Sequence, residues 1–229
     1  MAASRFSETP KATRAVKALL FDLDGTLAET DSLHFPLWAE LLGGHGVEVD
    51  WEFYQERVSG RLNPDIVAEL LPCVPRSETE ILLQNKEDEF RRRATELAPL
   101  PGLMRVLEES RRLGFATALV TNAPEENAHA MTGALGLEDF FDVEVLAGEL
   151  SAGKPDPLAY GTALRRLGIG PEAALAFEDS SSGIASAVGA GITTVGIAST
   201  HEPQTLLAAG ASYTYPDFDS PELRALIFG

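Results

Sequence analysis

Short apolar runs alternate with helical patterns along this chain, and the alternation restricts the folds that are open to it. Four runs read as buried parallel strands: residues 16–21, 115–121, 174–179 and 193–197; residues 143–148 are a weaker fifth candidate. The helical patterns between them cover residues 102–114, 125–136, 157–168 and 181–191, and each ends at a glycine suited to a helix C-terminus. Strand alternating with helix predicts an α/β fold with a doubly wound parallel sheet.

One interval interrupts this rhythm. Between Leu27 and about Pro99 there is no convincing strand, although a crossover between parallel strands needs only a helix and two short loops. Helical patterns fill it, at residues 31–46, 51–60, 63–71 and 77–97, and the charged run of the last one predicts a solvated face. We therefore expect a core domain made of residues 16–29 and 100–229, a helical domain inserted at 30–99, and a disordered arm at 1–15.

Composition narrows the possible partners and location. The formal net charge is −17, which argues against a nucleic-acid footprint because such surfaces are basic. No apolar run approaches the roughly 20 residues of a membrane span, and the first residues lack the apolar segment of a secretory signal. Cys73 is the only cysteine, so no internal disulfide can form. We expect a cytoplasmic protein with no membrane or nucleic-acid partner, and a monomer because no coiled-coil seam is evident.

Polar residues follow the predicted strands where each of them ends. In an open parallel sheet these ends share one edge, where ligands bind. The edge should therefore bring together the following side chains: Asp22 and Asp24 after the first strand, Thr121 and Asn122 after the second, Lys154 after residues 143–148, and Glu178 and Asp179 after residues 174–177.

This set of side chains predicts chemistry on a phosphoryl group. Several carboxylates packed together need a cation, and a set of oxygen ligands favours Mg²⁺. A lysine with two neutral donors suits the peripheral oxygens of a phosphoryl group. Asp22 is placed to attack phosphorus, and Asp24 to protonate the leaving oxygen and later to activate water. Each motif alone is weaker evidence for function, because "EDSSSG" and "TNAPEE" are also ordinary helix starts.

The same residues carry a family resemblance that spans residues 17 to 200. "DLDGT", "VTN", the lysine of "GKPDP" and "FEDSSSG" resemble, in order, the four motifs of the haloacid dehalogenase superfamily. The insertion resembles the helical C1 cap of its subfamily I, which includes β-phosphoglucomutase, phosphoglycolate phosphatase and sugar-phosphate phosphatases. The resemblance implies a Rossmann-like core and an aspartyl-phosphate formed on Asp22, with Asp24 as general acid and base.

Further roles follow from this resemblance alone. Thr121, Asn122 and Lys154 would hold the phosphoryl group. Mg²⁺ would be bound by Asp22, the backbone carbonyl of Asp24 and Asp179, with Glu178 orienting the metal's waters or ligating it directly.

The inserted domain should choose the substrate. "SGRLNPD" resembles the family's polar cap loop, with Gly60, Arg61 and Asn63 as the expected contacts. Asn63 stands where the mutases carry a substrate-binding arginine, and Arg61 lies two residues earlier, which departs from the mutase pattern. His34 stands where mutases carry a histidine near the acid/base, although a partly exposed hinge histidine is an alternative.

The sequence thus predicts a Mg²⁺-dependent phosphatase that acts on a small phosphorylated metabolite, such as a sugar phosphate. Three alternatives are open. A mutase of the β-phosphoglucomutase type would isomerise its substrate without net phosphate release. A dehalogenase is disfavoured because that branch lacks the second aspartate, here Asp24. A phospho-acceptor switch of the response-regulator kind would hold a long-lived acyl phosphate without turnover.

Overall fold

The computed structural model describes residues 16–229 of the protein. The predicted arm at 1–15 lies outside the described residues. The described chain forms a six-stranded parallel sheet in the order β3-β2-β1-β4-β5-β6. Its strands are β1 (Ala18–Phe21), β2 (Ala116–Thr121), β3 (Val143–Leu146), β4 (Ala174–Glu178), β5 (Thr193–Ile197) and β6 (Tyr213–Tyr215). The predicted doubly wound α/β sheet is confirmed.

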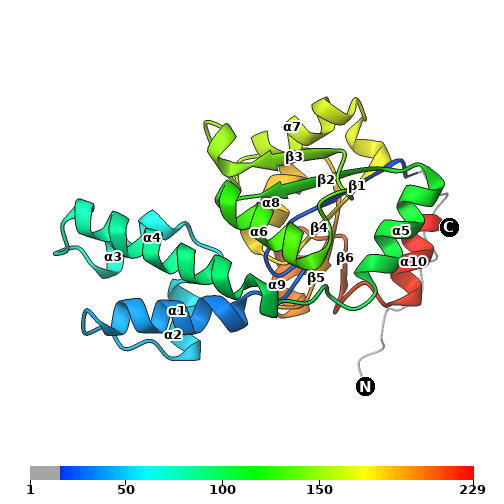
Figure 1. Ribbon diagram of the computed structural model, residues 1–229. Helices are drawn as coiled ribbons and strands as arrows, with labels where there is room; N and C mark the ends of the chain where they lie inside the picture. Colours follow the sequence, from blue (N-terminus) through cyan, green and yellow to red (C-terminus); the bar gives the residue numbers. More distant parts are fainter. Residues whose placement is uncertain (1–15) are drawn as a thin grey trace, which may run out of the picture.

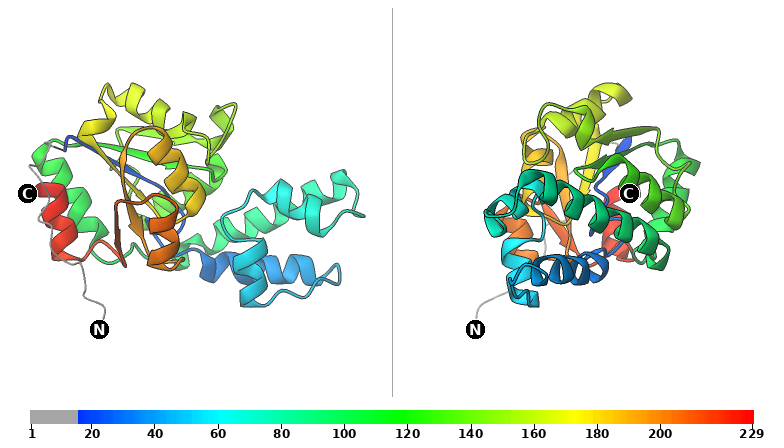
Figure 2. Two further views of the ribbon diagram at one scale, coloured as in Figure 1. Left: turned by 180° about the vertical axis from the view of Figure 1, so that it is seen from behind. Right: turned by 60° about the vertical axis from the view of Figure 1, so that its left-hand side comes forward.

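Helices cover both faces of the sheet (Figures 1 and 2). The core helices are α5 (Leu103–Leu113), α6 (Glu125–Leu135), α7 (Leu158–Leu167), α8 (Ser181–Gly189), α9 (Pro203–Ala208) and α10 (Pro221–Phe228). Because successive residues of a strand point to opposite faces, Leu19 and Phe21 of β1 pack in the cluster of α5, α6 and α10. Ala18 and Leu20 pack in the cluster of α7 and α8. The central strands are therefore buried on both sides, which explains their continuous apolar sequence.

A second group of helices lies between β1 and β2 in the chain and stands apart from the sheet (Figure 1). This helical lobe consists of α1 (Asp31–Gly43), α2 (Trp51–Arg57), α3 (Asn63–Leu70) and α4 (Arg76–Arg93), followed by a short 3₁₀ turn, Ala94–Glu96. It has an apolar cluster of its own around Trp38, Tyr54 and Ile66. The two connections to the core lie side by side, since the Leu100 amide donates to the Leu27 carbonyl at 2.8 Å. A domain division at residues 30 and 99 stays a prediction.

Local signals account for where several of these elements begin and end. Asp50 caps α2 by accepting a hydrogen bond from the Phe53 amide at 2.8 Å, and Ser180 caps α8 in the same way through the Gly183 amide. Pro64 stands in the first turn of α3, where its missing N–H costs nothing. Within the described residues, no helix has both the length and the apolar character needed to cross a membrane.

Candidate active site

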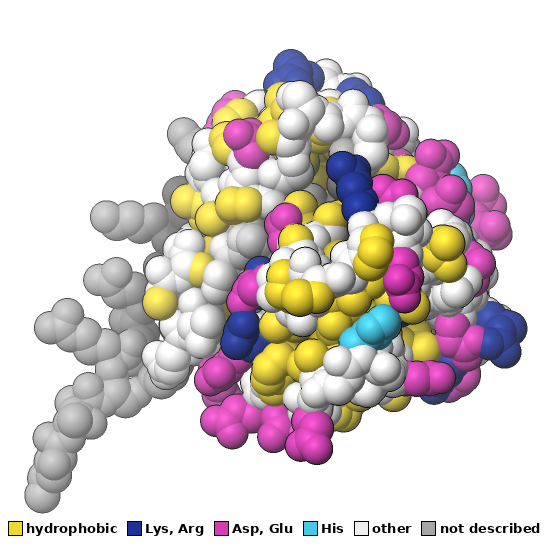
Figure 3. All heavy atoms as spheres, turned by 90° about the vertical axis from the view of Figure 1, so that its left-hand side faces the viewer, with side chains coloured by type: hydrophobic (Ala, Val, Ile, Leu, Met, Phe, Trp, Pro, Cys, Tyr) yellow, Lys and Arg dark blue, Asp and Glu magenta, His cyan; other side chains and the backbone are white. Residues whose placement is uncertain are grey.

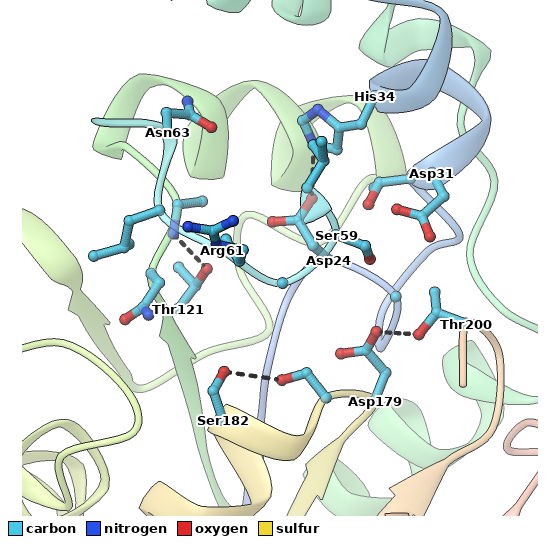
Figure 4. A pocket seen from close by; sticks show the side chains of 18 of the residues that line it. Asp24, Asp31, His34, Ser59, Arg61, Asn63, Thr121, Asp179, Ser182 and Thr200 are labelled. Carbon is cyan, nitrogen blue, oxygen red and sulfur yellow. Dashed lines mark hydrogen bonds and ion pairs between the residues drawn. The ribbon is translucent and has the colours of Figure 1, made fainter. Parts of the chain in front are cut away.

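The carboxyl edge of the sheet faces the helical lobe across a cavity of about 260 Å³ (Figure 4). Ten of the predicted site residues line this cavity: Asp22, Asp24, His34, Gly60, Arg61, Asn63, Thr121, Asn122, Lys154 and Asp179. Glu178, the remaining one, is fully buried and lies below the cavity rather than in its wall. Residues from six separate segments of the chain therefore meet at one place.

Lys154 is the centre of the buried charges. Its ammonium group donates to Asp22 Oδ1 at 2.5 Å, to Glu178 Oε1 at 2.6 Å and to the backbone carbonyl of Val120 at 2.7 Å. All three ammonium protons thus have an acceptor. Burial alone would lower the pKa of Lys154, but the charges of Asp22 and Glu178 outweigh it and raise that pKa, so the side chain stays positive.

Glu178 is held beneath the site by three donors, of which the Ser180 hydroxyl is the most distant, at 3.5 Å from Oε2. Besides the Lys154 ammonium, the Tyr160 hydroxyl donates to its Oε1 at 2.6 Å. Gly183, in the first turn of α8, lies so close that a Cβ at this position would overlap the Glu178 carboxylate. The glycine of "FEDSSSG" is therefore required by the close approach of this carboxylate.

Asp22, Glu178 and Asp179 form a cluster in which one carboxylate oxygen of each lies within 4.8 Å of the others. Burial, together with the charge of Glu178, raises the pKa of Asp22 to about 7, against the opposing effect of Lys154. Burial and the charges of Asp22 and Glu178 raise the pKa of Asp179 as well. Burial and like charge therefore oppose the ionisation of Asp22 and Asp179, and a hard divalent ion with oxygen ligands would offset this effect. The donor set fits Mg²⁺.

Asp24 lies beside this cluster and not in it. Its Oδ1 is 3.5 Å from His34 Nε2, and its side chain is about 35% exposed, facing the cavity. Burial raises its pKa, but the hydrogen-bonding groups of His34 and Thr30 outweigh burial and lower it. The His34 ring stacks on Phe90 of α4, with 4.2 Å between centroids. His34 is therefore tied both to Asp24 and to the lobe.

The loop after β2 supplies a hydroxyl and an amide. Thr121 Oγ1 lines the cavity and accepts a hydrogen bond from the Ala123 amide at 2.9 Å, which fixes its direction. The Asn122 side chain bonds both backbone groups of Lys154, accepting at 3.0 Å and donating at 3.2 Å. Asn122 thus holds the loop that carries Lys154.

The predicted lobe contacts lie in the cavity wall, but most of their polar atoms already have partners. Arg61 donates to Glu69 at 2.6 Å and to the Arg57 carbonyl at 2.8 Å. Asn63 donates to Glu87 Oε1 at 2.5 Å. Gly60 takes a positive φ of 72°, which turns the chain between α2 and α3.

The prediction that α4 presents only a solvated charged face is wrong. Lys86 and Glu87 are 6% and 7% exposed, and both line the cavity. Lys86 Nζ donates to Glu87 at 2.7 Å, lies 3.2 Å from His34 Nδ1, and stands over the Trp38 ring. Sequence reasoning missed this pair because the surrounding run, "NKEDEFRRR", is charged throughout. The only signal was the apolar Phe90 one turn further on.

Comparison with known proteins assigns the family. The haloacid dehalogenase-like hydrolase family model matches residues 16–191. Validoxylamine A 7′-phosphate phosphatase of Streptomyces hygroscopicus subsp. limoneus is 31% identical over 84% of this chain and 91% of its own length. A phosphorylated carbohydrates phosphatase of Thermotoga maritima is 32% identical, over 86% and 92%. The β-phosphoglucomutase of Bacillus subtilis is 27% identical, over 80% and 83%.

The fold agrees with solved structures of the same group. The crystal structure of CbbY from Rhodobacter sphaeroides in complex with phosphate superposes with a TM-score of 0.77 at 30% identity. The match covers 89% of this chain and 95% of that one. The family model runs from β1 through α8 and therefore includes the inserted helices. This chain is an enzyme of the haloacid dehalogenase-like hydrolase family, in the subfamily of CbbY, β-phosphoglucomutase and the sugar phosphatases.

Proposed function

We propose that this protein is a Mg²⁺-dependent phosphatase that hydrolyses a small phosphomonoester, a sugar phosphate or a similar metabolite, through an aspartyl-phosphate on Asp22. The observation that carries the proposal is the Asp22 carboxylate in the cavity wall, held 2.5 Å from the Lys154 ammonium, with Asp24 two residues further on. The phosphatase names of two relatives, 31% and 32% identical to this chain, support the same reaction class.

The proposed reaction has two halves. In the first, an Asp22 oxygen attacks phosphorus, the bond from phosphorus to the ester oxygen breaks, and the leaving oxygen takes a proton from the Asp24–His34 pair. In the second, Asp24 takes a proton from water, the water oxygen bonds to phosphorus, and the Asp22–phosphorus bond breaks. Thr121 and Lys154 contact the phosphoryl oxygens throughout. Bound Mg²⁺ would be held by Asp22, the Asp24 carbonyl and Asp179, with Glu178 behind them, and supplies positive charge that offsets the phosphoryl charge.

The rest of the cavity wall favours an uncharged, hydroxyl-rich leaving group. Among the described residues, every lysine or arginine that lines the cavity already has a carboxylate partner: Arg61 has Glu69, Lys86 has Glu87, and Lys154 has Asp22 and Glu178. A second phosphate or a carboxylate on the substrate would have to compete with one of these carboxylate partners. Asp31, Ser59 and Asn63 in the same wall suit sugar hydroxyls.

The same observation weakens the mutase alternative. A mutase must bind a bisphosphate intermediate, so it needs a second anion site in the lobe. Arg61 would have to leave Glu69 to provide one, and Asn63 carries no charge. Isomerisation of a sugar phosphate without net phosphate release would nevertheless identify a mutase.

The test is inorganic phosphate release from a panel of sugar phosphates, phosphoglycolate and sugar bisphosphates, with Mg²⁺ and with chelator. We expect metal-dependent release from sugar monophosphates that vanishes in Asp22→Asn. Asp65→Asn, the same change on an exposed part of α3, is the matched control and should behave as wild type. Full activity of Asp22→Asn would refute the nucleophile, and a stable phosphoenzyme without turnover would instead favour a phospho-acceptor switch.

A further inference from the structure

We propose that residues 199–201, which follow β5 and lie outside the four motifs, position the residues that would bind Mg²⁺. Ser199, Thr200 and His201 belong to the loop between β5 and α9. Thr200 and His201 also line the cavity, so the loop forms part of the site's wall. The inference depends on metal binding and not on the phosphatase reaction.

Two successive hydroxyls of this loop hold two different loops of the site. Ser199 Oγ donates to the backbone carbonyl of Gly25, the residue after Asp24. Thr200 Oγ1 donates to Asp179 Oδ2 at 2.5 Å (Figure 4). Gly25 and Asp179 follow β1 and β4, so the loop after β5 joins the two segments that carry the proposed ligands.

Close packing at this point explains why the contact orients Asp179. Gly25 has a φ of 72°, and a Cβ on it would overlap Asp179 Oδ2 and lie 3.1 Å from the Thr200 methyl carbon. Asp179 Oδ2 is thus confined between the Gly25 backbone and the Thr200 hydroxyl. With that oxygen fixed, rotation of the carboxylate is restricted and the other oxygen keeps a constant direction. Ligands oriented in this way bind metal more tightly than free ones.

The single proton of the Thr200 hydroxyl brings His201 into the same arrangement. A threonine hydroxyl has a single proton, and once Asp179 is ionised, as it would be with Mg²⁺ bound, that proton is given to the carboxylate. Thr200 Oγ1 also lies 3.0 Å from His201 Nδ1, so in that state it can only accept from the histidine. With metal bound, the order of donation would then run from His201 to Thr200 to Asp179. His201 and Thr200 are positioning residues, because they act on the metal through the Asp179 carboxylate and not as ligands themselves.

The test is calorimetric titration of the substrate-free protein with Mg²⁺. Thr200→Val keeps the side-chain shape and removes the hydroxyl, and we expect the Mg²⁺ dissociation constant to rise roughly tenfold or more. Thr200→Ser restores the hydroxyl and should return the constant to about twice the wild-type value or better. Thr205→Val makes the same change in α9, at an exposed residue outside the cavity, and should have no effect.

The outcomes separate positioning from general damage. A folded Thr200→Val protein with wild-type Mg²⁺ affinity would overturn the proposal, and so would a Thr200→Ser protein as weak as Thr200→Val. If Thr200→Val does not fold, His201→Phe decides, since it removes the Nδ1 donor but leaves the Thr200 hydroxyl. A raised dissociation constant supports the proposal, and a wild-type constant overturns it. Because calorimetry needs no substrate, the result stands even if phosphate release is never found.

Discussion

Glu178 shows how closely a single position in this site is determined by its neighbours. It has no solvent exposure, and its two short hydrogen bonds come from one ammonium group and one phenol, with the Ser180 hydroxyl further away at 3.5 Å. A carboxylate in such a place is stabilised only while these donors stay within reach. The absence of a side chain at Gly183 is what leaves room for it.

Gly183→Ala should therefore damage both stability and activity. The added methyl group overlaps the Glu178 carboxylate, so either α8 or Glu178 must move away from Lys154. We expect a loss of about 1–3 kcal/mol in the free energy of unfolding, measured by urea denaturation, together with a large fall in kcat. Gly43→Ala in α1 is the control, because nothing lies within 4 Å of the new methyl group. Equal stability of the two variants would contradict this account of Gly183.

At the scale of elements, α4 of the lobe and α6 of the core are joined by buried polar contacts. Asn127 of α6 donates to Glu87 of α4 and accepts from Arg91 Nη1 of α4 at 2.7 Å. Glu87 also accepts hydrogen bonds from Lys86 and Asn63, so this network of contacts extends to Asn63 at the start of α3. Asn127 is 3% exposed. The helical lobe is thus held against the sheet by a network whose members depend on one another.

Asn127→Ala should loosen the lobe without touching the reaction centre. It leaves a Glu87 oxygen and the Arg91 guanidinium each short of one partner, which costs about 1–3 kcal/mol of stability. Because the lobe is then held less closely, we expect the substrate KM to rise several-fold while kcat changes less, and the radius of gyration measured by X-ray scattering to increase. Asn85→Ala, on the exposed side of α4, is the control. A KM equal to wild type would show that this contact does not set the position of the lobe.

The elements also show what could and could not be predicted from sequence. β1, β2, β4 and β5 were predictable because a strand buried on both faces is apolar along its length. The edge strand β6 was missed, since it has three residues that are all only half-buried, and the short α9 and α10 were missed with it. Lys86 and Thr200 were missed because their burial depends on contacts with distant segments, which no local pattern records.

At the scale of the whole molecule, the net charge is −17, and Asp and Glu side chains are scattered over the face that Figure 3 shows, where they repel one another. The Asp22, Glu178 and Asp179 cluster concentrates the same repulsion in the interior. The surface charges and the buried cluster respond to different ions. Any salt screens the surface charges, since the Debye length is about 10 Å at 0.1 M, whereas the buried cluster is screened poorly and needs a bound cation.

Thermal unfolding should separate these two contributions. We expect Mg²⁺ to raise Tm above the value reached in NaCl of equal ionic strength, because a ligand at about 100 times its Kd adds about 2.7 kcal/mol to the native state. Asp179→Asn should lose this Mg²⁺-specific increase while keeping the response to NaCl. In chelator, the same variant should melt at a higher temperature than wild type, because burial and the neighbouring charges raise the pKa of Asp179 and so oppose its ionisation in the native state. Equal Tm values in Mg²⁺ and matched NaCl would mean that the cluster holds no metal. If the Asp179→Asn variant keeps the Mg²⁺-specific increase in Tm, the ion binds elsewhere.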